Sequence, residues 1–301
     1  MTAVTTVATV QQTFHFDNLL RRGQMQLQGK RVVITGASQG IGAAMAHAFR
    51  AQGATVLLVA RSQDKLADLG NKIGAEWLVA DLTNSTDLDA LVARCAGVLG
   101  HIDVWVNNAG VETDDAFVHT DRAEIRSLAR LNFEAPLMLT RDVLPHMLAR
   151  GSGHIVMTSS IAGAIPFPGL AAYAGSKAGL TNFSETLRLE LKGSGIGLTV
   201  VAPGPVDTAM WDRLDTPTSW QQPALTRFRR LMFLPKVDPT TIGVQVVNAV
   251  ANDKRFVRPK RRFGGYHALN NLPRRMVEVA LTGVRMPPLQ PTGDPFAAKD
   301  Q

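Results

Sequence analysis

The segment T-G-A-S-Q-G-I-G, Thr35–Gly42, decides the fold prediction because it joins a β-branched run to a helix-length amphipathic stretch. Gly36, Gly40 and Gly42 would allow a sharp turn and a close approach of the backbone to a ligand. A helix that begins near Ile41 would point its free N–H groups at an anion. A glycine trio is weak evidence by itself. Between a strand and a helix, it favours a pyrophosphate-binding loop over a glycine-rich turn without a ligand.

Outward from this motif, short apolar runs alternate with helix-length amphipathic stretches. The runs lack strict polar–apolar alternation, which is typical of strands buried on both faces. We therefore predict an α/β fold, a Rossmann-type doubly wound parallel sheet flanked by helices in a single domain. The strand candidates are Arg31–Thr35, Thr55–Val59, Glu76–Val79, Val104–Asn107, Gly153–Thr158 and Gly197–Val201. The helix candidates are Ile41–Gln52, Gln63–Ile73, Thr86–Leu99, Arg122–Met147 and Tyr173–Lys192.

The 301 residues, 45% of them hydrophobic, suit one large domain. We expect an N-terminal extension over residues 1–28, a dinucleotide-binding and catalytic domain over residues 29–262, and a C-terminal extension over residues 263–301. The lone Cys95 cannot form an internal disulfide, which fits a reducing compartment. Neither a signal peptide nor a membrane-spanning run is recognisable, so a cytoplasmic location is expected.

Positive charge is concentrated near the C-terminal end. The net charge is +7, and residues 226–285 hold thirteen Lys and Arg against three Asp and Glu. Such a segment is either a solvated face or a contact for an anionic partner. We expect no nucleic-acid binding, since no recognisable binding module with interleaved aromatic residues is present. Residues 266–283 are predicted to cover a pocket or join an oligomer contact, with peripheral membrane contact as the alternative.

The second predicted strand ends in V-A-R-S, Val59–Ser62. In NAD-binding folds an acidic residue at this place accepts the ribose hydroxyls. Arg61 stands there instead, and a guanidinium can bind a 2′-phosphate with charge-assisted hydrogen bonds. The residue favours NADP over NAD, with an ordinary surface arginine as the alternative.

A candidate catalytic group follows the fifth predicted strand. Tyr173 and Lys177 are four residues apart at the start of a helical stretch, which places them on one face. An ammonium near the phenol would lower its pKa, and the phenol could then exchange a proton with a carbinol oxygen. Ser160 lies just beyond the strand, where open parallel sheets bind ligands. The adjacent Ser159 competes for this role, and we prefer Ser160 for its spacing to Tyr173.

Together these motifs resemble the short-chain dehydrogenase/reductase family. The resemblance covers about Lys30 to Arg262 and rests on the glycine motif, N-N-A-G at Asn107–Gly110, Asn132, Ser160, Tyr173-x-x-x-Lys177 and P-G at Pro203–Gly204. It implies an oxidoreductase that acts on CH–OH groups and forms a dimer or tetramer. One departure is Gln39, because some NADP-preferring members carry a basic residue inside the glycine motif.

The resemblance also implies individual roles. Asp81 and Leu82 would contact the adenine ring, Asn132 would hold a water of a proton relay, and Lys177 would bind the nicotinamide ribose. Residues 203–208 would form a loop beside the nicotinamide. The complete set of expected cofactor-binding residues is Gly36, Ser38, Gly40, Ile41, Gly42, Arg61, Ser62, Asp81, Leu82, Asn108, Ala109, Gly110, Tyr173, Lys177, Pro203, Gly204, Val206 and Thr208.

The expected reaction moves a hydride between NADP(H) and a carbonyl compound or secondary alcohol, with Asn132, Ser160, Tyr173 and Lys177 as catalytic residues. Apolar residues between Met210 and Leu234 predict a lipophilic substrate of steroid, retinoid or fatty type, with core packing or a subunit contact as the alternative. A non-catalytic, redox-sensing NADP-binding regulator is the competing function. No metal site is expected, because the sequence lacks paired Cys/His spacing.

Overall fold

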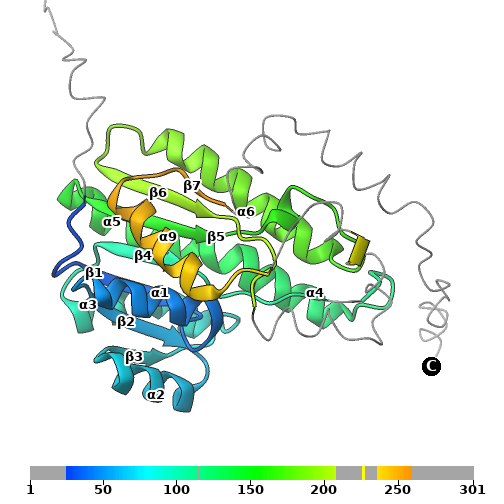
Figure 1. Ribbon diagram of the computed structural model, residues 1–301, viewed down its shortest axis with the longest axis horizontal. Helices are drawn as coiled ribbons and strands as arrows, with labels where there is room; N and C mark the ends of the chain where they lie inside the picture. The colour runs from blue at the N-terminus through cyan, green and yellow to red at the C-terminus, as the bar shows by residue number, and fades with distance from the viewer. Residues whose placement is uncertain (1–24, 114, 208–225, 228–235, 259–301) are drawn as a thin grey trace, which may run out of the picture.

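The computed structural model describes residues 25–113, 115–207, 226–227 and 236–258. Its centre is a seven-stranded parallel sheet with the strand order β3-β2-β1-β4-β5-β6-β7. The chain first builds outward from β1 to β3 and then returns to the other side of β1, so the direction of winding reverses between β1 and β4 (Figure 1). Ligands of open parallel sheets bind at the carboxyl ends of the strands beside such a reversal.

Both faces of the sheet are buried. In β1, Val32 and Ile34 pack on one face, and Val33 packs on the other. In β4, Val104 and Val106 likewise face away from Trp105. Successive side chains of a strand point to opposite faces, so a run of apolar residues serves two cores at once. The strands are β1 (Arg31–Thr35), β2 (Thr55–Ala60), β3 (Glu76–Val79), β4 (Val104–Asn107), β5 (Gly153–Thr158), β6 (Ile196–Val201) and β7 (Phe256–Val257).

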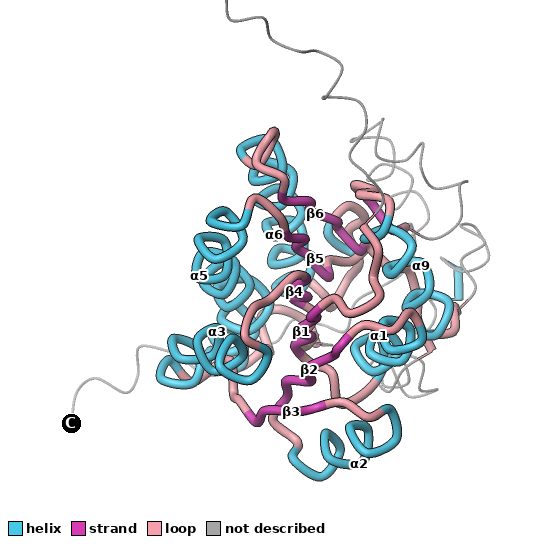
Figure 2. Tube along the Cα trace, turned by 90° about the vertical axis from the view of Figure 1, so that its left-hand side faces the viewer, coloured by secondary structure: helices cyan, strands magenta, loops and turns pink. Residues whose placement is uncertain are grey.

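Helices cover each face and form a three-layer arrangement (Figure 2). One layer holds α3 (Ser85–Leu99), α5 (Ala135–Arg150) and α6 (Ala171–Glu190). The opposite layer holds α1 (Gly40–Ala51), α2 (Gln63–Ile73) and α9 (Pro239–Ala251). Met25 and Leu27 also pack in this second layer, where the Met25 N–H donates to the carbonyl of Ala251.

The predicted fold class is confirmed, and the predicted strands match the observed ones to within one residue at each end. One predicted helix is divided. The stretch expected as Arg122–Met147 consists of α4 (Arg122–Ala129), a π-helical segment η2 (Arg130–Glu134) and α5. Helix α9 was not predicted, and a 3-10 turn, η3 (Ile161–Gly163), follows β5.

Several expectations concern residues outside the described ranges. These are residues 1–24 of the N-terminal extension, Thr208, most of the apolar segment between Met210 and Leu234, and residues 263–301. Among the described residues, no helix is long and apolar enough to span a membrane.

Candidate active site

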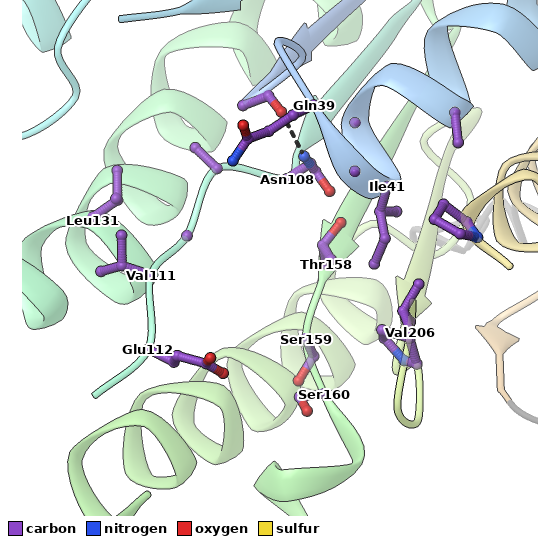
Figure 3. A pocket seen from close by; sticks show the side chains of 18 of the residues that line it. Gln39, Ile41, Asn108, Val111, Glu112, Leu131, Thr158, Ser159, Ser160 and Val206 are labelled. Atoms are coloured by element: carbon purple, nitrogen blue, oxygen red, sulfur yellow. Dashed lines mark hydrogen bonds between the residues drawn. The ribbon is translucent and has the colours of Figure 1, made fainter. Parts of the chain in front are cut away.

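A cavity of about 1180 Å³ opens at the carboxyl ends of the strands. The segments that follow β1, β2, β3, β4, β5 and β6 all contribute to its wall. Figure 3 shows side chains from the glycine loop, from the segment after β4 and from the end of β5 facing the same space. Residues distant in sequence therefore meet at one site because the strands are parallel.

The glycine loop after β1 leaves no room for side chains. Gly36 and Gly40 have φ values of +63° and +58°, in the left-handed region that favours glycine. A Cβ atom on Gly42 would lie 2.2 Å from the Gly36 carbonyl oxygen and 2.6 Å from Nδ2 of Asn108. The first turn of α1 can thus pack against the loop only with glycine at position 42, and the N-terminus of α1 faces the cavity.

Asn108 fixes this loop from the neighbouring strand. Its Nδ2 donates to the carbonyl oxygens of Thr35 at 3.0 Å and Gly36 at 3.2 Å. The Thr35 hydroxyl in turn accepts hydrogen bonds from the backbone N–H groups of Asn108 and Ala109. The loops after β1 and β4 therefore form one hydrogen-bonded unit, which holds the glycine loop in a single conformation.

A positively charged end of the cavity follows β2. Arg61, Ser62 and Lys65 line it, and the Nζ of Lys65 donates to Oε1 of Gln39 at 2.9 Å. The sequence prediction missed Lys65, although its position in the first turn of α2 places it beside the glycine loop. Gln39 thus holds the ammonium of Lys65, which lines the same cavity as Arg61.

Asp81 and Leu82 follow β3. Leu82 lines the cavity, whereas Asp81 is not among the lining residues. The Asp81 carboxylate accepts hydrogen bonds from the backbone N–H and the hydroxyl of Thr83. Partial burial raises the pKa of Asp81, but these bonds and the charge of Arg61 outweigh it, and the net pKa is lowered. Asp81 therefore adds negative charge next to Arg61.

Ser160, Tyr173 and Lys177 meet at the opposite end of the cavity. The Ser160 hydroxyl lies near enough to the phenol of Tyr173 to lower its pKa by hydrogen bonding. Lys177 Nζ lies 5.7 Å from the centre of the Tyr173 ring and donates to the carbonyl oxygen of Thr158 at 2.9 Å. One helix, α6, carries the tyrosine and the lysine, and the loop after β5 carries the serine.

Burial is the largest effect on the pKa values of Tyr173 and Lys177. It raises the pKa of Tyr173 to about 12; the bond from Ser160 acts in the opposite direction, and the Glu112 carboxylate raises the pKa further. Burial also lowers the pKa of Lys177 to about 8. The expected net lowering of the phenol's pKa is therefore not found, because burial is the largest effect on Tyr173. At neutral pH the phenol is uncharged and able to donate a proton.

The two adjacent serines have different partners. The Ser159 hydroxyl donates to the carbonyl of Lys177 and contacts the hydroxyl of Thr181, so it ties the end of β5 to α6. Ser160 caps η3, accepting a hydrogen bond from the N–H of Ala162, and also reaches Tyr173. These partners favour Ser160 over Ser159 as the residue that faces a reacting oxygen.

Asn132 is fully buried inside the π-helical segment η2 and does not line the cavity. Its Oδ1 accepts from the N–H of Val111 at 2.9 Å, and its Nδ2 donates to the Val111 carbonyl at 2.7 Å and to Ser176 Oγ at 3.2 Å. The asparagine therefore connects the segment after β4 to the helix that carries Tyr173. Single-turn π segments often occur at functional sites.

Most of the predicted residues meet in this cavity. Those that line it are Gly36, Ser38, Gly40, Ile41, Gly42, Arg61, Ser62, Leu82, Asn108, Ala109, Gly110, Ser160, Tyr173, Lys177, Pro203, Gly204 and Val206. Asp81 and Asn132 lie behind the wall, and Thr208 is outside the described residues. Glu112 and Thr158 also line the cavity and were missed, because neither stands out from its neighbours in sequence. In the described part of the chain, no group of three His, Cys, Asp or Glu side chains could hold a metal ion.

Comparisons with known proteins agree with this geometry. Residues 30–218 match the model of the family described as short chain dehydrogenase. Ketoacyl reductase HetN of Nostoc sp. is 42% identical over 185 residues, which are 60% of this chain and 64% of that protein. The 3-oxoacyl-(acyl-carrier-protein) reductase FabG of Escherichia coli is 32% identical over 188 residues, 62% of this chain and 77% of that one.

A solved structure with a bound cofactor gives the same result. The crystal structure of a metagenomic short-chain oxidoreductase in complex with NADP superposes with a TM-score of 0.64 at 31% identity. The match covers 78% of this chain and 99% of that one. The glycine loop lies at the reversal of the sheet, and a serine, a tyrosine and a lysine line the far end of the same cavity. The family model also spans most of the sheet. The chain therefore belongs to the short-chain dehydrogenase/reductase family of oxidoreductases.

Proposed function

We propose that the protein transfers a hydride between NADP(H) and a carbonyl compound or secondary alcohol. The observation that carries the proposal is the position of Ser160, Tyr173 and Lys177 in the same cavity as the glycine loop. The residues fit a dinucleotide, because Gly36, Gly40 and Gly42 line the cavity with backbone alone. A Cβ on Gly36 or Gly42 would collide with the segment after β4 or with the loop itself. A phosphate can approach such a backbone closely and accept hydrogen bonds from the N-terminus of α1.

The proposed preference for NADP over NAD rests on charge. Arg61 and Lys65 both line the cavity beyond β2 and can neutralise a 2′-phosphate. The positive charge of Arg61 helps to lower the pKa of Asp81, so the two side chains attract each other. The family member solved with NADP is consistent with this choice.

The mechanism follows from the protonation states. When bound, the reduced nicotinamide supplies a hydride to the carbonyl carbon. The uncharged phenol of Tyr173 donates its proton to the carbonyl oxygen, while the Ser160 hydroxyl hydrogen-bonds that oxygen. Lys177 stabilises the phenolate that is left, since an ammonium nearby favours the charged phenol. Asn132 Oδ1 retains a second lone pair beyond its bond to Val111, and we propose that it holds the water that returns the proton.

We propose a lipophilic substrate. Of the steroid, retinoid and fatty classes that the sequence suggests, we favour the fatty class. The wall around Tyr173 contains Ile165, Phe167 and Leu170, which favours an apolar substrate. Two relatives carry names that describe ketoacyl reduction, and we extend that class to this chain as part of the proposal. The assembly into dimers or tetramers and the cytoplasmic location stay predictions.

The decisive variant is Tyr173→Phe. It should abolish most NADPH oxidation with a panel of lipophilic ketones and β-keto thioesters, and leave the fluorescence-measured affinity for NADPH nearly unchanged. Ser159→Ala is the matched control for Ser160→Ala: the first should keep far more turnover than the second. Turnover near the wild-type level in Tyr173→Phe would refute the mechanism. NADPH binding by the wild-type protein without turnover of any carbonyl would favour the redox-sensing regulator.

A further inference from the structure

The hydroxyl of Thr158 lacks a hydrogen-bond partner among the described residues although it is buried. The residue is 7% exposed, and its Oγ1 makes no bond, whereas its backbone carbonyl accepts from Lys177 Nζ. Leaving a buried hydroxyl unsatisfied costs roughly 1–3 kcal/mol of stability. A group retained at such a cost is explained most simply by a ligand that satisfies it.

The direction of the hydroxyl follows from the strand. Val156 of β5 packs in the layer of α1 and α9, and Met157 packs in the opposite layer. Side chains alternate along a strand, so Thr158 faces the same side as Val156, toward α1. Figure 3 shows the Thr158 oxygen pointing into the pocket, on the side of Asn108 and Ile41.

This position lies between the two functional ends of the cavity. Ile41 belongs to the glycine loop, and the Thr158 carbonyl holds the lysine of the catalytic group. In the proposed binding mode, Arg61 holds the 2′-phosphate of the dinucleotide and the glycine loop holds its pyrophosphate. The nicotinamide nucleotide is then the part of the cofactor that lies near Tyr173. That half of the cofactor carries ribose hydroxyls and a carboxamide, which can both donate to and accept from a hydroxyl.

We propose that Thr158 binds the nicotinamide half of the cofactor through its side-chain hydroxyl. The inference rests on the proposed function, because it assumes that a dinucleotide occupies the cavity. One residue then acts twice, since its hydroxyl holds the cofactor and its carbonyl holds Lys177. The inference names a binding residue that neither the glycine motif nor the Ser–Tyr–Lys group includes.

The test separates the two halves of the cofactor. Thr158→Val replaces the hydroxyl by a methyl group of similar shape and keeps the backbone carbonyl for Lys177. It should raise the Kd for NADPH, measured by fluorescence titration, about five- to tenfold, the worth of one hydrogen bond. Calorimetric titration with adenosine 2′,5′-bisphosphate, which lacks the nicotinamide nucleotide, should give the wild-type Kd. Thr158→Ser, which keeps a hydroxyl, should restore most of the affinity for NADPH.

A stability comparison tests the same hydroxyl without any ligand. Thr140 is also buried, but its hydroxyl donates to the Pro136 carbonyl and accepts from Asn107 Nδ2. Thr140→Val should therefore lower the urea midpoint of the ligand-free protein, while Thr158→Val should leave it unchanged or raise it. A lowered midpoint in Thr158→Val would show that the hydroxyl already has a structural partner and would overturn the proposal.

The remaining outcomes are also decisive. An unchanged Kd for NADPH in Thr158→Val would overturn the proposal, as would an equal loss of affinity for NADPH and adenosine 2′,5′-bisphosphate. A wild-type protein that binds NADPH but reduces no carbonyl would refute the proposed enzymatic activity, and the binding comparison at Thr158 would still decide the role of the hydroxyl.

Discussion

At the scale of single residues, the chemistry of the site depends on which groups are charged. Tyr173 can act as an acid because burial keeps its phenol neutral well above physiological pH. Lys177 Nζ lies 5.7 Å from the centre of the Tyr173 ring and uses one of its three N–H groups to bind the Thr158 carbonyl. A reaction in the reducing direction therefore starts from the protonation state that the fold already favours.

The titration of Tyr173 is directly measurable. The chain has two tyrosines, so Tyr266→Phe leaves Tyr173 as the single phenol. With its pKa raised to about 12, Tyr173 in the folded variant should remain mainly neutral at about pH 10.5, judged by phenolate absorbance, and should ionise near pH 10 once the chain is denatured. Substantial ionisation of the folded protein below pH 10 would contradict a buried neutral phenol.

Cofactor choice is also decided by single side chains. Arg61→Asp should weaken NADPH binding much more than NADH binding, because a carboxylate repels a 2′-phosphate and accepts ribose hydroxyls. Lys65→Gln should act in the same direction with a smaller effect, since the ammonium of Lys65 lines the same end of the cavity. Lys72→Gln on the same helix, away from the cavity, is the control and should change neither Kd. An equal loss of both cofactors in Arg61→Asp would exclude the assignment to a 2′-phosphate.

The sequence predicted most of these residues but not their electrostatics. Arg61 and Ser160 were predicted because each follows the end of a predicted strand, and Tyr173 because it stands four residues before Lys177. Lys65 could not be predicted, since its role depends on a hydrogen bond from α2 to Gln39 of the glycine loop. The pKa of Tyr173 was predicted in the wrong direction, because spacing along a helix does not report how deeply a phenol is buried.

At the scale of elements, the N-terminus of α1 packs closely against the glycine loop. Gly42→Ala would place a methyl group 2.2 Å from the Gly36 carbonyl oxygen, and either the helix or the loop must shift. We expect loss of measurable NADPH binding by fluorescence titration with the fold retained by circular dichroism. The control is Gly97→Ala in α3, where a Cβ meets nothing within 4 Å and a helix gains from alanine. NADPH affinity retained in Gly42→Ala would argue against a phosphate at this loop.

Apolar patterns in the sequence predict that an element exists better than they predict where it is interrupted. Strand β5 was predicted correctly because continuous burial is visible as a run of apolar residues. The stretch Arg122–Met147 was predicted as one helix, because a single π-helical turn at Asn132 barely alters the apolar pattern. Within that turn Asn132 hydrogen-bonds Val111 of the segment after β4, a contact between distant segments that the apolar pattern does not reveal.

At the scale of the whole molecule, the buried lysine makes stability depend on pH. Burial lowers the pKa of Lys177 from 10.5 to about 8, so between these values the unfolded chain binds more protons than the folded one. By linkage, the free energy of unfolding then rises with pH over this window, and the cost of burying the ammonium is fully present below about pH 8.

Comparison of the wild-type protein with Lys177→Met isolates this contribution. The variant carries no titrating group at the position, so its unfolding free energy should lack the rise between about pH 8 and 10.5. Relative to the variant, the wild-type protein should gain on the order of 2 kcal/mol between pH 7 and pH 10, measured by urea denaturation. The opposite slope would mean that the ammonium is stabilised where it lies. Burial would then not be the dominant effect on the pKa of Lys177. The lysine would stay an ammonium across this window, and its stabilisation of the Tyr173 phenolate would extend to higher pH.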